Sequence, residues 1–198
     1  MRNNKLLKIC VLTVLSVFCS LFEITSVVAS DFSDRLFDGH HVLLIRHAHA
    51  PGVGDPPGYT LADCATQRNL GEQGRQQAAQ IGSWLKQQGV QTARVYSSPW
   101  CRCRDTAALL GLGSVTLEAS LGSFFNDMGK AGDQTMRLRA FIAQRMKDNS
   151  KVPIILVTHH VNIEAYTGRV VSVGDMVLAR VGPGGDARSI QLYPSTKL

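Results

Sequence analysis

Basic residues follow directly on a buried strand in the run HVLLIRHAHA at residues 41–50. Four aliphatic residues lead into Arg46 and His47, and His49 follows two positions after His47. Burying an unpaired guanidinium costs several kcal/mol, so Arg46 must reach water or meet an anion. The pattern therefore indicates an anion-binding site at the end of this strand.

Two further apolar runs lead into the same residue types. The run at 93–97 is followed by SSPWCR, which places Arg102 in the first turn of a helix, and the run at 152–158 ends at His159. Open α/β sheets bind ligands beyond the carboxyl ends of their strands, and the free amides of a helix N-terminus favour anions. We therefore expect these two residues and the Arg-His pair to converge at one edge of a sheet.

The expected cluster suits a phosphoryl dianion better than a metal ion, because it brings no acidic side chain. Guanidinium forks match phosphate oxygens bidentately. Neighbouring positive charge lowers the pKa of an imidazole in this cluster, and a neutral imidazole is a competent nucleophile. Attack on phosphorus would form a phosphohistidine, with Arg46, Arg102 and the second histidine stabilising the charge on the phosphoryl oxygens. The predicted chemistry is metal-independent phosphate hydrolysis with no cofactor.

An alternation of apolar runs and amphipathic segments positions these residues. The segments at 71–89 and 134–147 carry apolar residues at helical spacing. Ser98 and Pro99 form the expected N-cap and first turn of a helix that Gly111 would end. Strands are expected at 41–46, 93–97, 114–117 and 152–158, with a late antiparallel pair at 175–181 and 188–193. This alternation predicts an α/β fold whose largely parallel sheet is covered on both faces.

Three motifs, in the order LIRHAHA, SSPWCRCRDTA and VTHHVNI, resemble the signatures of the histidine phosphatase superfamily in its phosphoglycerate mutase-like branch. NLGEQGRQQA is similar to the family's helix-opening motif, and the resemblance spans about residues 39–195. The resemblance implies a three-layer α/β/α sandwich with a mostly parallel central sheet. It also implies that His47 is the nucleophile and His159 the second histidine. Arg46 and Arg102 would bind the phosphate.

The chain departs from the family pattern at the expected proton donor. In LEASLGSFFNDMG the family's glutamate aligns near Ser123, where no acid is present. Asp127 is the candidate donor, with an ordinary solvated turn residue as the alternative, and Glu118 is a poorer candidate. General acid catalysis contributes about 10² to 10⁴ in rate. A site without a donor would therefore hydrolyse phosphoramidates or acyl phosphates more readily than phosphate esters of alcohols.

A long loop at 48–69, rich in proline and glycine, follows the first motif, and loops of this length are usually functional or disordered. Strand alternation would return His49 to the side of His47, where it could touch substrate unless the chain turns. Arg68 could add a phosphate contact, with a solvated loop arginine as the alternative. We place His49 and Arg68 at a possible substrate rim.

The first thirty residues have the features of a signal peptide: a basic start, an apolar stretch and the small-residue cleavage pattern SVVAS. An uncleaved membrane anchor is the alternative, but the apolar stretch is short of the ~20 residues that a membrane span needs. We expect cleavage to leave residues 31–198 as a single histidine phosphatase-like domain. This domain would be periplasmic or secreted, with no stable membrane insertion.

Removal of residues 1–30 would leave Cys64, Cys101 and Cys103 in an oxidising compartment. Cys101 and Cys103 are too close in sequence to bridge each other comfortably. Cys64 is therefore expected to pair with one of them, which would contribute roughly 3 to 4 kcal/mol by loop closure. Three buried, reduced cysteines are the alternative. Zinc is disfavoured, because arginines alternate with the two neighbouring cysteines and would repel a dication.

The 198-residue chain has a formal charge of +6 but no basic stripe interleaved with aromatic residues, so a nucleic-acid partner has little support. We expect a phosphomonoesterase acting on a small phosphorylated molecule. An exported member resembles phosphatases that act on cell-envelope sugar phosphates. The alternatives are a catalytically silent domain that binds phosphorylated ligands and a phosphohistidine or phosphoramidate phosphatase.

Overall fold

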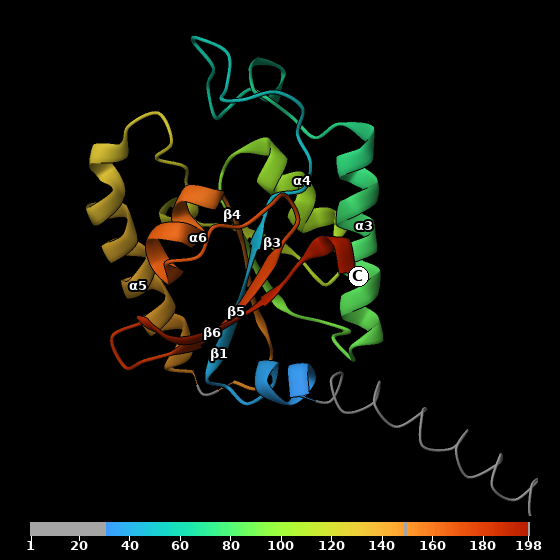
Figure 1. Ribbon diagram of the computed structural model, residues 1–198, viewed down its shortest axis with the longest axis vertical. Helices are drawn as coiled ribbons and strands as arrows, with labels where there is room; N and C mark the ends of the chain where they lie inside the picture. Colours follow the sequence, from blue (N-terminus) through green and yellow to red (C-terminus); the bar gives the residue numbers. More distant parts are fainter. Residues whose placement is uncertain (1–30, 149, 198) are drawn as a thin grey trace, which may run out of the picture.

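Six strands form one mixed sheet in the computed structural model, which describes residues 31–148 and 150–197 (Figure 1). The strands are β1 (His41–Arg46), β2 (Arg94–Ser97), β3 (Val115–Leu117), β4 (Ile154–Thr158), β5 (Met176–Val181) and β6 (Ala187–Tyr193). Their order in the sheet is β3-β2-β4-β1-β5-β6. The first four of that order are parallel, whereas β5 is antiparallel to β1 and to β6. The expected sheet is thus confirmed, while the expected signal peptide at 1–30 lies outside the described residues.

Helices cover both faces of the sheet (Figure 1). One face carries α3 (Glu72–Gln87) and α4 (Cys101–Leu109), and the other carries α5 (Ala131–Met146) and α6 (His160–Thr167). Short 3-10 helices lie at η1 (Cys64–Thr66), η2 (Ala119–Leu121), η3 (Met128–Lys130) and η4 (Ser195–Lys197), and residues 31–36 are also helical. The predicted three-layer α/β/α arrangement is therefore confirmed. None of the helices in the described part of the chain is long and apolar enough to cross a membrane.

Alternate residues of β1 face the two helical layers. Leu43 lies in the apolar cluster that contains Ile81 of α3, whereas Leu44 lies in the cluster that contains Ile142 of α5. Fully burying such a side chain contributes about 1.5 to 3 kcal/mol. Because both faces are covered, the strand has no polar face, and its sequence is a continuous apolar run. This packing fixes the position at which the strand ends and the polar residues begin.

The start of α4 differs from the sequence-based expectation. Its N-cap residue is Trp100 and its first residue is Cys101, whereas Ser98 was expected as the N-cap. Ser98 instead continues the sheet, because its N–H donates to the Val157 carbonyl at 2.9 Å. Its hydroxyl is bonded to His159 Nε2 at 2.8 Å. The prediction that Ser98 caps the helix was therefore wrong.

The loop at 48–69 is tied to α4 by a disulfide between Cys64 and Cys101. The predicted pairing of Cys64 is confirmed, and Cys103 remains a free, buried thiol. Within the loop, Arg68 Nε donates to the Gly54 carbonyl at 2.8 Å. The loop is therefore held both to itself and to the helix that carries Arg102.

Gly74 lets α3 approach the segment that follows β1. A Cβ atom at Gly74 would lie 1.9 Å from the backbone carbonyl oxygen of His49. The N–H of Gly71 donates to the same oxygen at 3.3 Å. Because the glycines of the NLGEQGRQQA motif have no side chain, the start of α3 can pack directly against the backbone that follows β1.

We predict that Gly74→Ala lowers the free energy of unfolding by about 2 kcal/mol or more, because the added methyl group must displace backbone. Gly132→Ala is the matched control, since a Cβ at this helical glycine meets nothing within 4 Å. That control should leave stability unchanged or raise it by up to about 1 kcal/mol. Urea denaturation of the three proteins measures both effects. Equal stability of Gly74→Ala and the wild type would contradict the close packing.

The disulfide closes a loop with a sequence separation of 37 residues. We predict that Cys64→Ser/Cys101→Ser lowers the free energy of unfolding by roughly 3 to 4 kcal/mol, because the unfolded chain regains the entropy of the open loop. Thermal unfolding of the oxidised protein, the reduced protein and the double variant tests this. The reduced protein and the variant should unfold together, below the oxidised protein. Coincidence of all three transitions would contradict the prediction.

Candidate active site

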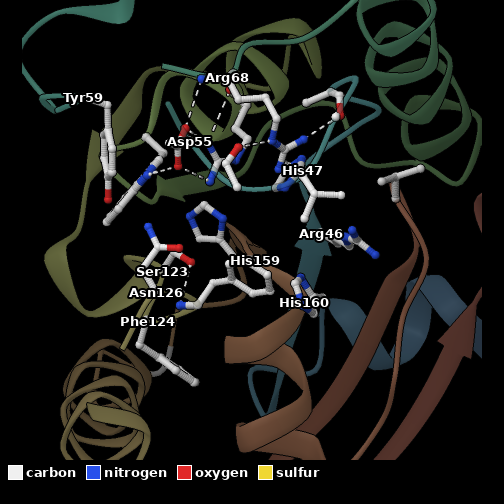
Figure 2. Close-up of a pocket in the computed structure, with 18 of the residues that line it drawn as sticks. Arg46, His47, Asp55, Tyr59, Arg68, Ser123, Phe124, Asn126, His159 and His160 are labelled. Atoms are coloured by element: carbon white, nitrogen blue, oxygen red, sulfur yellow. Dashed lines mark hydrogen bonds and ion pairs between the residues drawn. The ribbon is translucent and has the colours of Figure 1, made fainter. Parts of the chain in front are cut away.

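A cavity of about 580 Å³ opens at the carboxyl ends of β1, β2 and β4. Figure 2 shows Arg46, His47, Arg68, His159 and His160 around it. The complete lining also includes Arg102, His49, Asp55, Tyr59, Trp100, Lys130, the residues from Ser123 to Asp127, and five small or aliphatic residues of the adjoining loops. The structure thus brings together the four residues that the sequence placed at the strand ends. It adds a wall from the loop at 48–69 and another from residues 123–127.

Backbone pairing between adjacent strands sets the position of the two central histidines. Arg46 at the end of β1 pairs with Thr158 at the end of β4. The N–H of His47 then donates to the Thr158 carbonyl at 2.9 Å. The next residue of each strand is therefore a histidine, and the two imidazole centroids lie 5.5 Å apart.

His47 is held in one tautomer by its own backbone. Its Nδ1 lies 2.8 Å from the Ala48 carbonyl oxygen, which can only accept a hydrogen bond. Nδ1 therefore carries the proton, and Nε2 keeps the lone pair. Burial, with a smaller effect of the nearby charges of Arg102, Arg46 and Arg68, lowers the pKa of His47 to about 3, although the hydrogen bond to Ala48 raises it. The imidazole is neutral at physiological pH, as a nucleophile must be.

His159 is buried beside His47, and its Nε2 is bonded to Ser98 Oγ at 2.8 Å. The same nitrogen lies 3.5 Å from Cys103 Sγ, and the Trp100 ring packs edge-on with a centroid distance of 5.3 Å. Burial, followed by the charges of His47 and Arg102, lowers the pKa of His159 well below its ordinary value. Its ring is therefore fixed in place and uncharged.

Three arginines line the cavity, and each of them donates to at least one backbone carbonyl. Arg46 Nη1 donates to the Val171 carbonyl at 2.8 Å, and Arg68 donates to the carbonyls of Gly54 and Ala50. The Nε atoms of Arg46 and Arg102 are buried and have no hydrogen-bond partner among the described residues. An unpaired buried donor costs about 1 to 3 kcal/mol, so these donors favour an anion. Arg68, expected at the rim, is half-buried in the cavity wall.

Asp55 is a residue of the site that the sequence analysis missed. Its carboxylate forms an ion pair with Arg102, with an Nη1–Oδ1 distance of 2.7 Å and both side chains 4% exposed. The motifs alone had indicated a cluster without an acid. Asp55 is one of two acids in the loop at 48–69, and the signal that could have found it is the need of a buried Arg102 for a partner.

The remaining candidates lie farther from the two histidines. Asp127 lies at the rim, exposed, with Oδ2 paired to Lys130 Nζ at 3.0 Å. Glu118 is outside the cavity lining and caps η2 by accepting from the Ser120 N–H at 2.8 Å. His49 lines the cavity, with a buried Nδ1 that has no partner among the described residues. His49 thus lies in the cavity wall, as expected. Neither Asp127 nor Glu118 is bonded to His47 or His159.

The chain is similar to known proteins in part of its sequence and in its fold. A sequence profile described as histidine phosphatase superfamily (branch 1) matches residues 42–122. That segment contains Arg46, His47, Asp55 and Arg102, whereas His159 lies beyond it. No curated protein sequence matches the chain.

Several solved structures share the fold at low sequence identity. The protein histidine phosphatase SixA complexed with tungstate superposes with a TM-score of 0.54 and 17% identity, covering 79% of this chain and 98% of that one. A mycobacterial glucosyl-3-phosphoglycerate phosphatase gives 0.57 and 16%, covering 78% and 97%. A phosphoserine phosphatase from Entamoeba histolytica, complexed with 3-phosphoglyceric acid, gives 0.53 and 18%, covering 78% and 98%. These likenesses concern the overall fold.

We predict that the free energy of unfolding falls as the pH falls from about 6.5 to about 3, in part because of His47. In this range the unfolded imidazole binds a proton and the folded one does not, so acid favours the unfolded chain. His47→Asn should make this dependence shallower, whereas His40→Asn, at an exposed position just before β1, is the control and should not. Urea denaturation at pH 7.5 and pH 5 measures the slopes. Identical slopes for His47→Asn and the wild type would contradict a buried, neutral His47.

Proposed function

We propose that this chain is a member of the histidine phosphatase superfamily (branch 1), whose profile matches residues 42–122, and that it hydrolyses phosphate monoesters through a phosphohistidine at His47. The observation that carries the proposal is the buried, neutral imidazole of His47 with its Nε2 lone pair free, surrounded by three arginines. A phosphoryl group is the ligand whose charge and shape suit this arrangement.

In the proposed reaction, Nε2 of His47 attacks phosphorus in line with the leaving oxygen. The bond from phosphorus to the leaving group breaks as the bond to nitrogen forms. Arg46 and Arg102 donate to the phosphoryl oxygens, on which negative charge is spread in the transition state. His159 donates to the same oxygens from the other wall, with its ring held by Ser98. Water then attacks the phosphohistidine, and inorganic phosphate leaves.

The proposal needs no metal ion or cofactor for these steps. Among residues 31–148 and 150–197, no three His, Cys, Asp or Glu side chains form a group that could hold a metal ion. The substrate proposed is a small phosphorylated molecule, with cell-envelope sugar phosphates as one class. Export to the periplasm or the cell exterior is part of the proposal. It is supported by the leader-like sequence of residues 1–30 and by the disulfide, which persists in oxidising compartments.

A second candidate function is hydrolysis of phosphohistidine or another phosphoramidate. It is favoured because no acid in the described part of the site is paired with His47 or His159, so no proton donor stands ready for an alcohol leaving group. For alcohol leaving groups we propose Asp127 as the donor, which would act from the rim after separating from Lys130. A phosphoramidate does not depend on that movement, because its nitrogen leaving group is protonated from water. The ratio of phosphoramidate to alkyl phosphate turnover therefore reports how much Asp127 contributes.

We predict that His47→Ala lowers turnover of p-nitrophenyl phosphate by at least 10³-fold, because the nucleophile is removed. The wild type should also acquire acid-labile, base-stable label from a ³²P-labelled phosphate monoester, and its turnover should persist in EDTA. His40→Ala, at the opposite end of β1, is the matched control and should keep both turnover and label. Turnover that survives in His47→Ala would contradict the phosphohistidine mechanism. Phosphate binding without turnover of any substrate would identify a silent phospholigand-binding domain.

We predict that Asp127→Asn lowers turnover of an alkyl phosphate about 10- to 10²-fold, because leaving-group protonation is lost. Turnover of phosphoramidate should change less than threefold. The two substrates are compared on the same preparation, with Asp133→Asn in the exposed first turn of α5 as the control. An equal loss on both substrates would contradict a donor role for Asp127.

A further inference from the structure

The buried carboxylate of Asp55 accepts four hydrogen bonds. Its two oxygens accept from Arg102 Nη1 at 2.7 Å, Arg102 Nη2 at 3.2 Å, the Arg68 N–H at 3.0 Å and Trp100 Nε1 at 3.1 Å (Figure 2). A carboxylate has about four lone-pair sites, so Asp55 is saturated. Burial raises its pKa, but these hydrogen bonds and the charge of Arg102 outweigh that effect and lower it. Asp55 is thus a fixed anion and is unsuited to donate a proton.

The two Nη atoms form one edge of the Arg102 guanidinium, and Asp55 binds this edge. Nη1 has a second, longer bond to the Arg68 carbonyl at 3.3 Å. The other edge consists of Nε and the remaining hydrogen of Nη2, and Nε has no partner among the described residues. A guanidinium can bind one oxyanion on each of these edges. The end-on edge of Arg102 is therefore occupied, and its side-on edge is unoccupied.

Two further attachments tie the loop that carries Asp55 to the start of α4. The disulfide ties Cys64 in the same loop to Cys101, the residue before Arg102. Trp100, the N-cap residue of α4, donates its indole N–H to Asp55. The loop and the start of the helix are therefore fixed to each other at two points besides the Asp55–Arg102 pair. Such support is expected around a side chain that must keep one orientation.

Asp55 also sets the charge of the phosphoryl site. The cavity is lined by Arg46, Arg68 and Arg102. Among the described lining residues, Asp55 is the carboxylate that forms an ion pair with an arginine, Arg102. The other lining acid, Asp127, is paired with Lys130. Three guanidinium groups and one carboxylate leave a formal charge of about +2, which matches a phosphoryl dianion.

From these contacts we propose that Asp55 is a positioning residue, which holds Arg102 by its end-on edge so that the side-on edge faces the phosphoryl group. This inference rests on the proposed function only in requiring that the cavity bind a phosphoryl group. The competing arrangement is that Asp55 occupies the place of the phosphate and must be displaced by it. Two of the four donors to Asp55, the Arg68 amide and the Trp100 indole, favour positioning, because displacement would leave both without an acceptor.

The test is phosphate binding by the full chain, measured by titration calorimetry with inorganic phosphate. Asp55→Asn has the same size but presents an amide N–H₂ to Arg102, so phosphate should bind at least tenfold more weakly. Asp63→Asn is the matched control, because Asp63 lies in the same loop but outside the cavity lining, and its affinity should be unchanged. Phosphate bound equally or more tightly by Asp55→Asn would overturn the proposal.

A double-variant cycle separates positioning from a general structural role. If Asp55 acts through Arg102, Asp55→Asn should weaken phosphate binding less than twofold in an Arg102→Gln background. An undiminished loss in that background would overturn the proposal. Calorimetric unfolding of each variant verifies that it is folded at the titration temperature.

A second measurement uses the wild-type protein and stands if Asp55→Asn does not fold. In ¹⁵N-labelled protein, the Nε–Hε signal of Arg102 is identified by its absence in Arg102→Lys. Phosphate should move this proton signal downfield, as expected for a new hydrogen bond at Nε. An unchanged signal at saturating phosphate would overturn the proposal. Calorimetric phosphate binding and the Arg102 Nε–Hε signal do not require turnover. The proposed hydrolysis is tested independently, in the p-nitrophenyl phosphate assay, so its failure can be told apart from failure of this inference.

Discussion

Repulsion among like charges is the constraint on which the site depends. Arg46, Arg68 and Arg102 line one cavity with His47 and His159, so a proton on either histidine would add charge to a cationic space. Burial and these arginines keep both rings neutral. The same charges that would bind a phosphoryl dianion therefore also preserve the lone pair that would attack it. The arginine charges thus serve both binding and nucleophile activation, although burial has the larger effect on the pKa of both histidines.

The rest of the structure keeps these charges close together against their repulsion. The parallel pairing of β1 with β4 fixes the two histidines, and packing on both faces of the sheet fixes the strands. The disulfide and the Asp55–Arg102 ion pair hold the loop at 48–69 over the strand ends. Removing one partner of a buried ion pair leaves an uncompensated charge, so this loop is as much a part of the site as the strands.

The sequence predicted those features that follow from periodicity. Apolar runs ending in Arg46, His47 and His159 indicated their placement, because parallel strands in one sheet bring their carboxyl ends to a common edge. Asp55 escaped prediction because a proline- and glycine-rich loop has no period, and its path depends on tertiary contacts. The disulfide partner of Cys64 was undecided for a similar reason. Residues two apart on a helix face nearly opposite sides, and the sequence does not show which side meets the loop.

The central claim is that Nε2 of His47 faces a phosphoryl site formed by the arginines. A crystal structure of the protein with orthovanadate, which resembles the transition state of phosphoryl transfer, tests this most directly. The account predicts a bond between vanadium and His47 Nε2, with vanadate oxygens within hydrogen-bond distance of Arg46 and Arg102. Vanadate bound elsewhere, or bound in the cavity with His47 turned away from it, would contradict the account.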